Sequence, residues 1–148
     1  MLYEKTIFFI ILPLYLDAQD NTVKDRDFFG DLTKAEIDII VNKGTERAFS
    51  GDYVDLYEVG IYVCKACNNP LFDSESKFKS NCGWPSFDNE IKNSLIRIQD
   101  NSYGMQRIEI CCSNCKGHLG HVFEGERLTE KNLRHCVNSI SIKFISKE

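Results

Sequence analysis

The amino-acid sequence predicts one mainly β domain, with mostly antiparallel strands and a small helical part near the N-terminus. Its 148 residues, of which 43% are hydrophobic and 27% charged, fit a single globular domain with its own core. Short runs rich in Val, Ile, Tyr and Phe recur between clusters of Gly, Asn, Asp and Ser, as in antiparallel β proteins. A helix start signal precedes all of these runs.

The helical part is predicted over residues 34–43. Thr33 and Glu36 have the spacing of a capping box, in which each side chain bonds the other residue's backbone N–H. Apolar residues then recur at helical spacing at positions 37, 40 and 41, and Gly44 stands where a C-terminal cap is expected. This helix should bury one stripe of side chains.

Four segments after the helix are predicted to be strands. They cover residues 59–64, 95–98, 106–111 and 139–145. Several of them alternate between apolar and polar residues, which is the period of a strand with one buried face.

Residues 1–18 are predicted to be a signal peptide. Lys5 precedes an apolar run from Thr6 to Leu16, and Ala18 offers a small residue at the cleavage point. The run is too short to span a bilayer, which takes about 20 residues, so no stable membrane insertion is expected. We therefore expect an exported protein, periplasmic or secreted, with a linker over 19–31 and a functional domain over 32–148. A buried N-terminal strand is the alternative interpretation.

The charge of the chain argues against nucleic-acid binding. Its 18 Lys and Arg residues against 22 Asp and Glu residues give a formal net charge of -4. Proteins that bind phosphate backbones carry an excess of basic residues instead.

Two C-x-x-C pairs among the seven cysteines predict a metal site. Four thiolates in two chelating turns are the ligands of a structural zinc, and they leave no open position for a substrate, so we expect one Zn²⁺ per chain. The four ligands are Cys64, Cys67, Cys112 and Cys115. Redox-active C-x-x-C motifs or disulfides of an exported protein are the alternatives. Cys111 is a rival for Cys112, but its spacing to Cys115 does not match that of the first pair.

The remaining cysteines lie in distinctive surroundings. Cys82 begins the string Cys-Gly-Trp-Pro-Ser-Phe, in which Trp84, the single tryptophan, stands between a flexible and a rigid residue. Cys136 lies in Arg-His-Cys-Val-Asn-Ser, at the start of the last predicted strand. His118 and His121 follow directly on the second C-x-x-C pair. Simpler interpretations are a core tryptophan and buried, inert thiols.

These strings resemble the B-type methionine sulfoxide reductases, which act on the R epimer of methionine sulfoxide. The resemblance runs from about Leu32 to Phe144. Its motifs are residues 44–47, both C-x-x-C pairs, residues 82–87, residues 118–123 and residues 136–139. It implies two antiparallel β-sheets pinned by the zinc site, with short N-terminal helices.

The resemblance also implies roles for individual residues. Cys136 would be the nucleophile and Cys82 the resolving cysteine. Trp84, His118, His121 and Asn138 would lie in the substrate site. Three features depart from the family pattern: His135 replaces an aromatic residue, the loop over 125–133 lacks a Pro-containing turn, and Cys111 is an additional thiol.

The chemistry requires a thiolate and a proton donor together, because a sulfoxide sulfur becomes electrophilic as its oxygen is protonated. His121 or His118 can supply the proton, and Arg134 and the histidines are candidates to favour the thiolate. His135 is a poor partner for Cys136, since neighbours on a strand point to opposite faces. Attack leaves a sulfenic acid on Cys136, and Cys82 converts it to a disulfide. The expected partners are therefore methionine R-sulfoxide, free or in oxidised proteins, and a thioredoxin-like reductant.

A non-catalytic zinc-stabilised β module that binds a protein partner is the alternative from another functional class. Such a module has no need for two non-ligand cysteines in motifs that also contain an aromatic ring and two histidines. The sequence therefore favours the enzyme.

Overall fold

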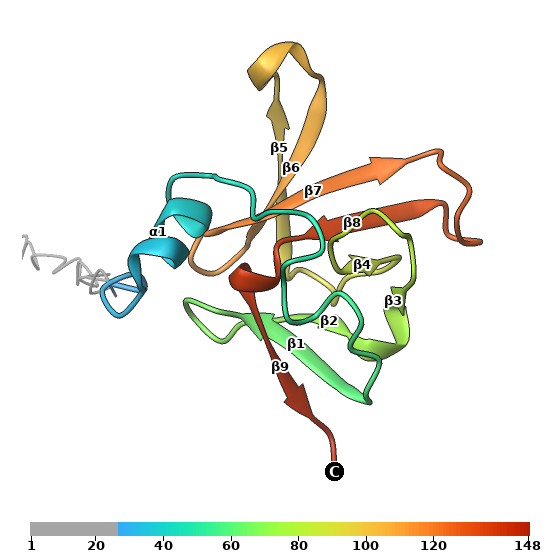
Figure 1. Ribbon diagram of the computed structural model, residues 1–148, viewed down its shortest axis with the longest axis horizontal. Helices are drawn as coiled ribbons and strands as arrows, with labels where there is room; N and C mark the ends of the chain where they lie inside the picture. Colours follow the sequence, from blue (N-terminus) through green and yellow to red (C-terminus); the bar gives the residue numbers. More distant parts are fainter. Residues whose placement is uncertain (1–26) are drawn as a thin grey trace, which may run out of the picture.

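The computed structural model describes residues 27–148, so the predicted signal peptide and most of the predicted linker lie outside the described residues. Two antiparallel sheets form the described part of the chain, as predicted (Figure 1). The three-stranded sheet has the order β2-β1-β9, and the six-stranded sheet has the order β3-β4-β8-β7-β6-β5. None of the described helices is long and apolar enough to cross a membrane.

The strands and helices have the following bounds. The elements are α1 Lys34–Ile40, β1 Gly60–Cys64, β2 Pro70–Asp73, η1 Ser74–Ser76, β3 Lys77–Phe78, β4 Ser86–Phe87, β5 Leu95–Asp100, η2 Ser102–Gly104, β6 Arg107–Cys112, β7 His118–Glu124, β8 Leu133–Val137, η3 Ser139–Ser141 and β9 Ile142–Ser146, where η denotes a 3₁₀ helix.

The predicted capping box starts α1, the single α-helix of residues 27–148. The Thr33 hydroxyl accepts from the Glu36 N–H, and the Glu36 carboxylate accepts from the Thr33 N–H at 2.8 Å. The helix ends three residues before the predicted end at 43. Lys43 adopts a left-handed φ of 59°, and the Gly44 N–H bonds the Asp38 carbonyl, which closes the helix with a turn.

The end of the chain differs from the sequence prediction. The strand predicted over 139–145 begins only at Ile142, because Ser139 and Ile140 donate their N–H groups to the Glu46 carboxylate and form η3. Cys136 therefore does not start the last strand. It lies on β8, which belongs to the other sheet.

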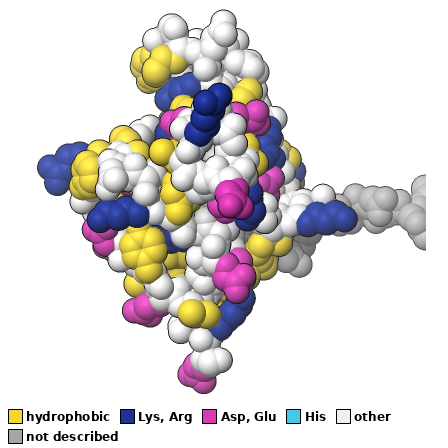
Figure 2. Space-filling view, turned by 90° about the vertical axis from the view of Figure 1, so that its right-hand side faces the viewer, with side chains coloured by type: hydrophobic (Ala, Val, Ile, Leu, Met, Phe, Trp, Pro, Cys, Tyr) yellow, Lys and Arg dark blue, Asp and Glu magenta, His cyan; other side chains and the backbone are white. Residues whose placement is uncertain are grey.

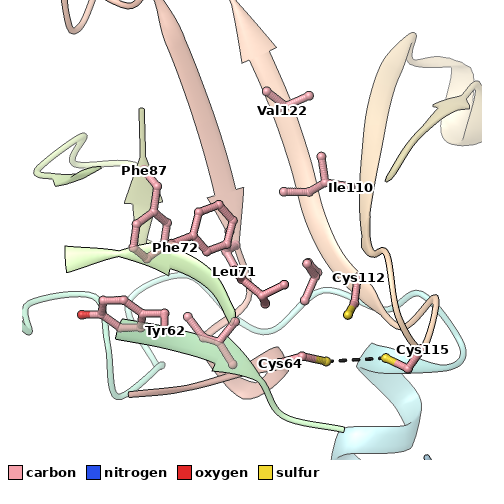
Figure 3. Close-up of a cluster of buried hydrophobic side chains, with 12 residues drawn as sticks. Tyr62, Cys64, Leu71, Phe72, Phe87, Ile110, Cys112, Cys115 and Val122 are labelled. Atoms are coloured by element: carbon pink, nitrogen blue, oxygen red, sulfur yellow. Dashed lines mark hydrogen bonds between the residues drawn. The ribbon is translucent and has the colours of Figure 1, made fainter. Parts of the chain in front are cut away.

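The core lies between the two sheets. Aromatic rings fill its centre, where Phe72 stacks on Phe87 with ring centroids 4.3 Å apart and Tyr62 meets Phe87 edge-on (Figure 3). Cys64, Cys112 and Cys115 continue this buried cluster toward α1. Charged side chains of both signs are interspersed over the face shown in Figure 2.

Candidate active site and metal site

Cys136 lies in the middle of the six-stranded sheet. Its partners across the sheet are Ser86 on β4 and His121 on β7. A side chain at Gly120 would collide with the Cys136 carbonyl group, so glycine at that position permits the close approach of β7 and β8. Two neighbouring strands thus fix the backbone that carries the Cys136 thiol.

Cys82 lies in the loop before β4, with its sulfur 3.9 Å from the sulfur of Cys136. The loop turns at Gly83, whose φ of 97° is in a region that side-chain-bearing residues rarely adopt. A disulfide requires sulfurs about 2.05 Å apart, so an approach of about 2 Å would join the two residues.

The two thiols share one negative charge. A hydrogen bond from Cys136 lowers the pKa of Cys82, and the Ser80 hydroxyl, which donates to the Cys82 sulfur at 3.0 Å, lowers this pKa further. The same contact with Cys82, together with burial, raises the pKa of Cys136, while the positive charge of Arg134 opposes this rise. One proton therefore leaves the pair readily, and removal of the second is resisted.

A cavity of about 110 Å³ adjoins the Cys136 thiol. Three of the other residues predicted for the site, Trp84, His121 and Asn138, line this cavity with Cys136. Phe123 and Arg107 line it as well. A small chemical group bound in this cavity would therefore contact a reactive sulfur, an aromatic ring and an imidazole.

Glu46 connects the parts of this cavity. The Trp84 indole N–H donates to the Glu46 carbonyl at 3.1 Å, and the Glu46 N–H donates to the Asn138 side-chain oxygen at 3.0 Å. The Glu46 carboxylate also accepts from the backbone of Ser139 and Ile140. This single residue therefore positions Trp84 and Asn138 relative to the end of β8.

His121 is oriented by a carboxylate from the neighbouring hairpin. Its Nε2 lies 2.7 Å from Asp100 Oδ2, and Arg107 donates to the same oxygen at 3.0 Å. The hydroxyl and the backbone N–H of Ser102 bind the other oxygen and, with His121, hold the pKa of Asp100 well below its usual range. Asp100 is thus an anion that fixes one nitrogen of the His121 ring.

His118 occupies a different position from His121. Its ring is buried and meets the His121 ring edge-on with centroids 5.6 Å apart, but it is not among the residues that line the Cys136 cavity. Its Nδ1 lies 2.7 Å from Glu109, and burial lowers the pKa of the imidazole. His118 therefore contacts His121 but lies outside the Cys136 cavity.

Arg134 and His135 lie on opposite faces of β8, as the alternation of strand residues predicts. Arg134 shares the face of Cys136 and makes a two-pronged ion pair with Glu126 at 2.7 and 2.9 Å. His135 is fully buried on the other face, where its Nδ1 lies 2.9 Å from the Phe87 carbonyl and its Nε2 2.8 Å from Glu90. The structure thus separates His135 from the Cys136 cavity.

The four predicted ligand cysteines lie together at one end of the core. The sulfurs of Cys64 and Cys115 are 3.6 Å apart (Figure 3). Those of Cys67 and Cys112 are 3.5 Å apart. All four lie within 4.8 Å of one another, so this group could hold a metal ion.

Both C-x-x-C segments have the same turn. The residue after the second cysteine, Asn68 or Lys116, has a left-handed φ of 62° or 65° and donates its N–H to the carbonyl of the first cysteine at 2.9 Å. The first turn connects β1 to β2 in the three-stranded sheet, and the second connects β6 to β7 in the six-stranded sheet. The cysteine cluster therefore links the two sheets.

Cys111 points away from this cluster. Adjacent strand residues face opposite sides, and the Cys111 thiol donates to Glu109 at 3.2 Å. Burial raises the pKa of Cys111 to about 12.

Comparisons with known proteins identify the family. A model of the SelR domain matches residues 32–146, which is most of the chain. The chain belongs to the SelR domain family. Its relatives include three proteins called peptide methionine sulfoxide reductase MsrB. The one from Teredinibacter turnerae is 49% identical over 128 residues, covering 84% of this chain and 93% of the relative. The one from Methanosarcina mazei is 46% identical, covering 88% and 94%, and the one from Burkholderia cenocepacia is 40% identical, covering 88% and 95%.

Sequence reasoning alone missed two residues that organise this SelR domain. Asp100 lies at the end of a strand that was predicted only as far as residue 98, and no motif pointed to its contact with His121. Glu46 belongs to a motif of the resemblance, but its contacts with Asn138 and η3 span more than 90 residues of sequence. An acidic residue at a strand end and an acidic residue in a loop motif were the available signals.

Proposed function

We propose that this protein reduces methionine R-sulfoxide to methionine, with Cys136 as the nucleophile. The observation that carries the proposal is the Cys136 thiol, which lines a small cavity beside an indole and an imidazole while a second thiol lies 3.9 Å away. The MsrB-named relatives support this activity and favour it over a non-catalytic β module.

In the first step, Cys136 passes its proton to Cys82, and the Cys136 thiolate attacks the sulfur of the sulfoxide to form a transient S–S bond. This S–S bond and the S–O bond of the substrate then break as the oxygen takes a proton and passes to Cys136, which becomes a sulfenic acid while the substrate becomes methionine. His121 is the proton donor in this proposal, since it lines the cavity and Asp100 fixes its ring. His118 supports His121 through the edge-on ring contact.

In the second step, Cys82 attacks the sulfenic acid. The Cys82 sulfur bonds to the Cys136 sulfur, and the hydroxyl leaves with a proton as water. An external dithiol then reduces the disulfide and is itself oxidised, which restores both thiols. We infer a thioredoxin-like protein as this reductant.

Trp84 is proposed to select the substrate epimer. Its indole N–H is already bonded to Glu46, so the ring is held in one orientation at the cavity wall. An aromatic face interacts favourably with a soft sulfur centre and its methyl group. Asn138 lines the cavity and completes the proposed substrate site. Arg134 does not line the cavity, and its proposed role is that of a positive charge beside Cys136.

We infer that the four-cysteine group holds one structural Zn²⁺. A tetrahedron of thiolates with Zn–S near 2.3 Å places sulfurs about 3.8 Å apart, close to the separations in this cluster. N–H groups of Asn69 and Gly117 point at two of the sulfurs, at 3.6 and 3.5 Å, as suits thiolate charge. When bound, the ion joins the two sheets and takes no part in the reaction.

The proposed activity is tested by supplying each epimer of methionine sulfoxide to the purified protein with dithiothreitol as reductant. The R epimer should be consumed and the S epimer left. Equal rates on both epimers, or no reaction with either, would reject the proposal.

Export remains a separate proposal, tested by the N-terminal sequence of the mature protein from its host, which should begin near Gln19.

A further inference from the structure

A second, larger cavity adjoins the Cys136 cavity. It has a volume of about 530 Å³, against about 110 Å³ for the cavity at the thiol. Thr45, Arg107 and His121 line both of them. A molecule whose reacting group lies at Cys136 can therefore extend past His121 into the larger space.

The hairpin of β5 and β6 forms one wall of the larger cavity, which we call the hairpin cavity. The hairpin projects from the rest of the molecule at the top of Figure 1, and η2 forms its tip. Two apolar side chains of this wall are exposed, Tyr103 at 91% and Ile98 at 41%. Figure 2 shows hydrophobic side chains at the same end of the molecule. An aromatic ring thus stands uncovered at the wall of the hairpin cavity.

The shape of the tip is fixed by hydrogen bonds. Asp100 accepts from the N–H and the hydroxyl of Ser102, at 3.0 and 2.6 Å, and the Met105 N–H donates to the Ser102 carbonyl. Tyr103 itself has a left-handed φ of 55°, which these bonds hold in place. The same Asp100 orients His121, so the exposed ring and the imidazole are set by one carboxylate.

The polar groups of the hairpin cavity suit an uncharged ligand. Its two basic side chains are already paired, Lys43 with Glu109 at 2.8 Å and Arg107 with Asp100 at 3.0 Å. An anionic ligand would have to compete with these carboxylates. Side-chain amides from Asn42, Gln99 and Asn101 also line the cavity. The nitrogens of Asn42 and Gln99 already donate to Asp38 and to Asn101 and Arg107. The oxygens of Asn42 and Gln99 and the N–H groups of Asn101 are left to accept from and donate to a polypeptide backbone.

We propose that the hairpin cavity binds the polypeptide residues next to an oxidised methionine, and that Tyr103 packs against an apolar neighbour of that methionine. This inference rests on the proposed sulfoxide reductase activity. It assigns Tyr103 to substrate selection and gives it no part in the chemical steps. The ligand class is an extended peptide with apolar side chains beside the sulfoxide.

The test compares two substrates, with dithiothreitol as reductant. One is free methionine R-sulfoxide, and the other is a blocked pentapeptide in which phenylalanine flanks methionine R-sulfoxide on both sides. In Tyr103→Ser, the ratio of kcat/KM for the peptide to kcat/KM for the free amino acid should fall about two- to tenfold, the range for one aromatic contact. Tyr103→Phe should retain the wild-type ratio, and Ile98→Ser should lower it.

Leu128→Ser is the matched control, because Leu128 is 52% exposed but lines neither cavity. It should leave the ratio unchanged. An unchanged ratio in both Tyr103→Ser and Ile98→Ser, or an equal loss on both substrates, would overturn the inference while leaving the proposed activity intact. A wild-type protein that reduces neither substrate would refute the proposed activity and, with it, this inference.

Discussion

The Nε2 atom of His121 lies 2.7 Å from the carboxylate of Asp100, on a hairpin adjacent to the strand that carries the imidazole. Asp100 is in turn held by Ser102 and Arg107. A residue outside the recognised motifs thus fixes the ring proposed to protonate the substrate.

Asp100→Asn should therefore lower kcat more than it changes KM. The amide keeps the size of the side chain but removes the charge that pairs with the ring. A general acid contributes a factor on the order of 10²–10⁴ to the rate, and we expect kcat to fall at least about tenfold. Asp88→Asn, at an exposed ion pair with Lys131, is the control and should retain wild-type kinetics. A wild-type kcat in Asp100→Asn would remove Asp100 from the mechanism.

Removal of one cysteine of the proposed zinc site should cost both metal and fold. Cys112→Ser leaves three sulfurs, and structural zinc supplies on the order of 10 kcal/mol, comparable with the net stability of a domain. Metal analysis and thermal unfolding should show loss of zinc and of the cooperative transition. Cys111→Ser is the matched control, since the neighbouring thiol faces Glu109 and should leave one zinc per chain. Full zinc content in Cys112→Ser would show that another group is the ligand.

The shared charge of the thiol pair predicts a pH effect. Contact with Cys82 is the main cause that raises the pKa of Cys136, so Cys82→Ser should lower that pKa. A lower pKa gives more thiolate at a given pH, and alkylation of Cys136 by iodoacetamide should therefore reach its half-maximal rate at a lower pH than in the wild type. Mass spectrometry of the Cys136 peptide measures this rate. A midpoint that stays or rises would contradict the shared-charge account.

Glu46 is expected to support both stability and binding. Glu46→Ala leaves the N–H groups of Ser139 and Ile140 without their acceptor, a loss of about 1–3 kcal/mol in the free energy of unfolding. The backbone bonds of residue 46 to Trp84 and Asn138 remain, but the loop that carries them loses its tie to η3, so KM should rise. Urea unfolding and steady-state kinetics measure the two effects, with Glu36→Ala on the exposed capping box as a comparison. Equal free energies of unfolding for Glu46→Ala and the wild type would show that the bonds from the Glu46 carboxylate to η3 are dispensable.

The sequence was sufficient for the features with local signals. The capping box, the two C-x-x-C turns and four of the strand positions follow from spacing and composition, and the structure has each of them. Five strands were missed, namely β2, β3, β4, β7 and β8. Strands β3 and β4 have two residues each, which are too few for a pattern to show. Strand β7 was missed because it is buried on both faces along most of its length, which removes the alternation.

The candidate site was only partly predictable for a similar reason. Cys136 was placed on the wrong strand, since nothing local reveals that Glu46 captures the following backbone and ends β8. His118 and His121 are three residues apart in one motif, yet only His121 lines the Cys136 cavity. That difference depends on Glu109 and Asp100, which reach the histidines across the sheet.

The most direct test of the central claim is the chemical state of the cysteines after one turnover. Wild-type protein, fully reduced and freed of reductant, is mixed with one equivalent of methionine R-sulfoxide and digested for mass spectrometry. We expect one methionine released per chain and a Cys82–Cys136 disulfide, which thioredoxin with its reductase should then remove. Release of methionine with a disulfide between Cys136 and Cys111, or with Cys136 still a free thiol, would contradict the account.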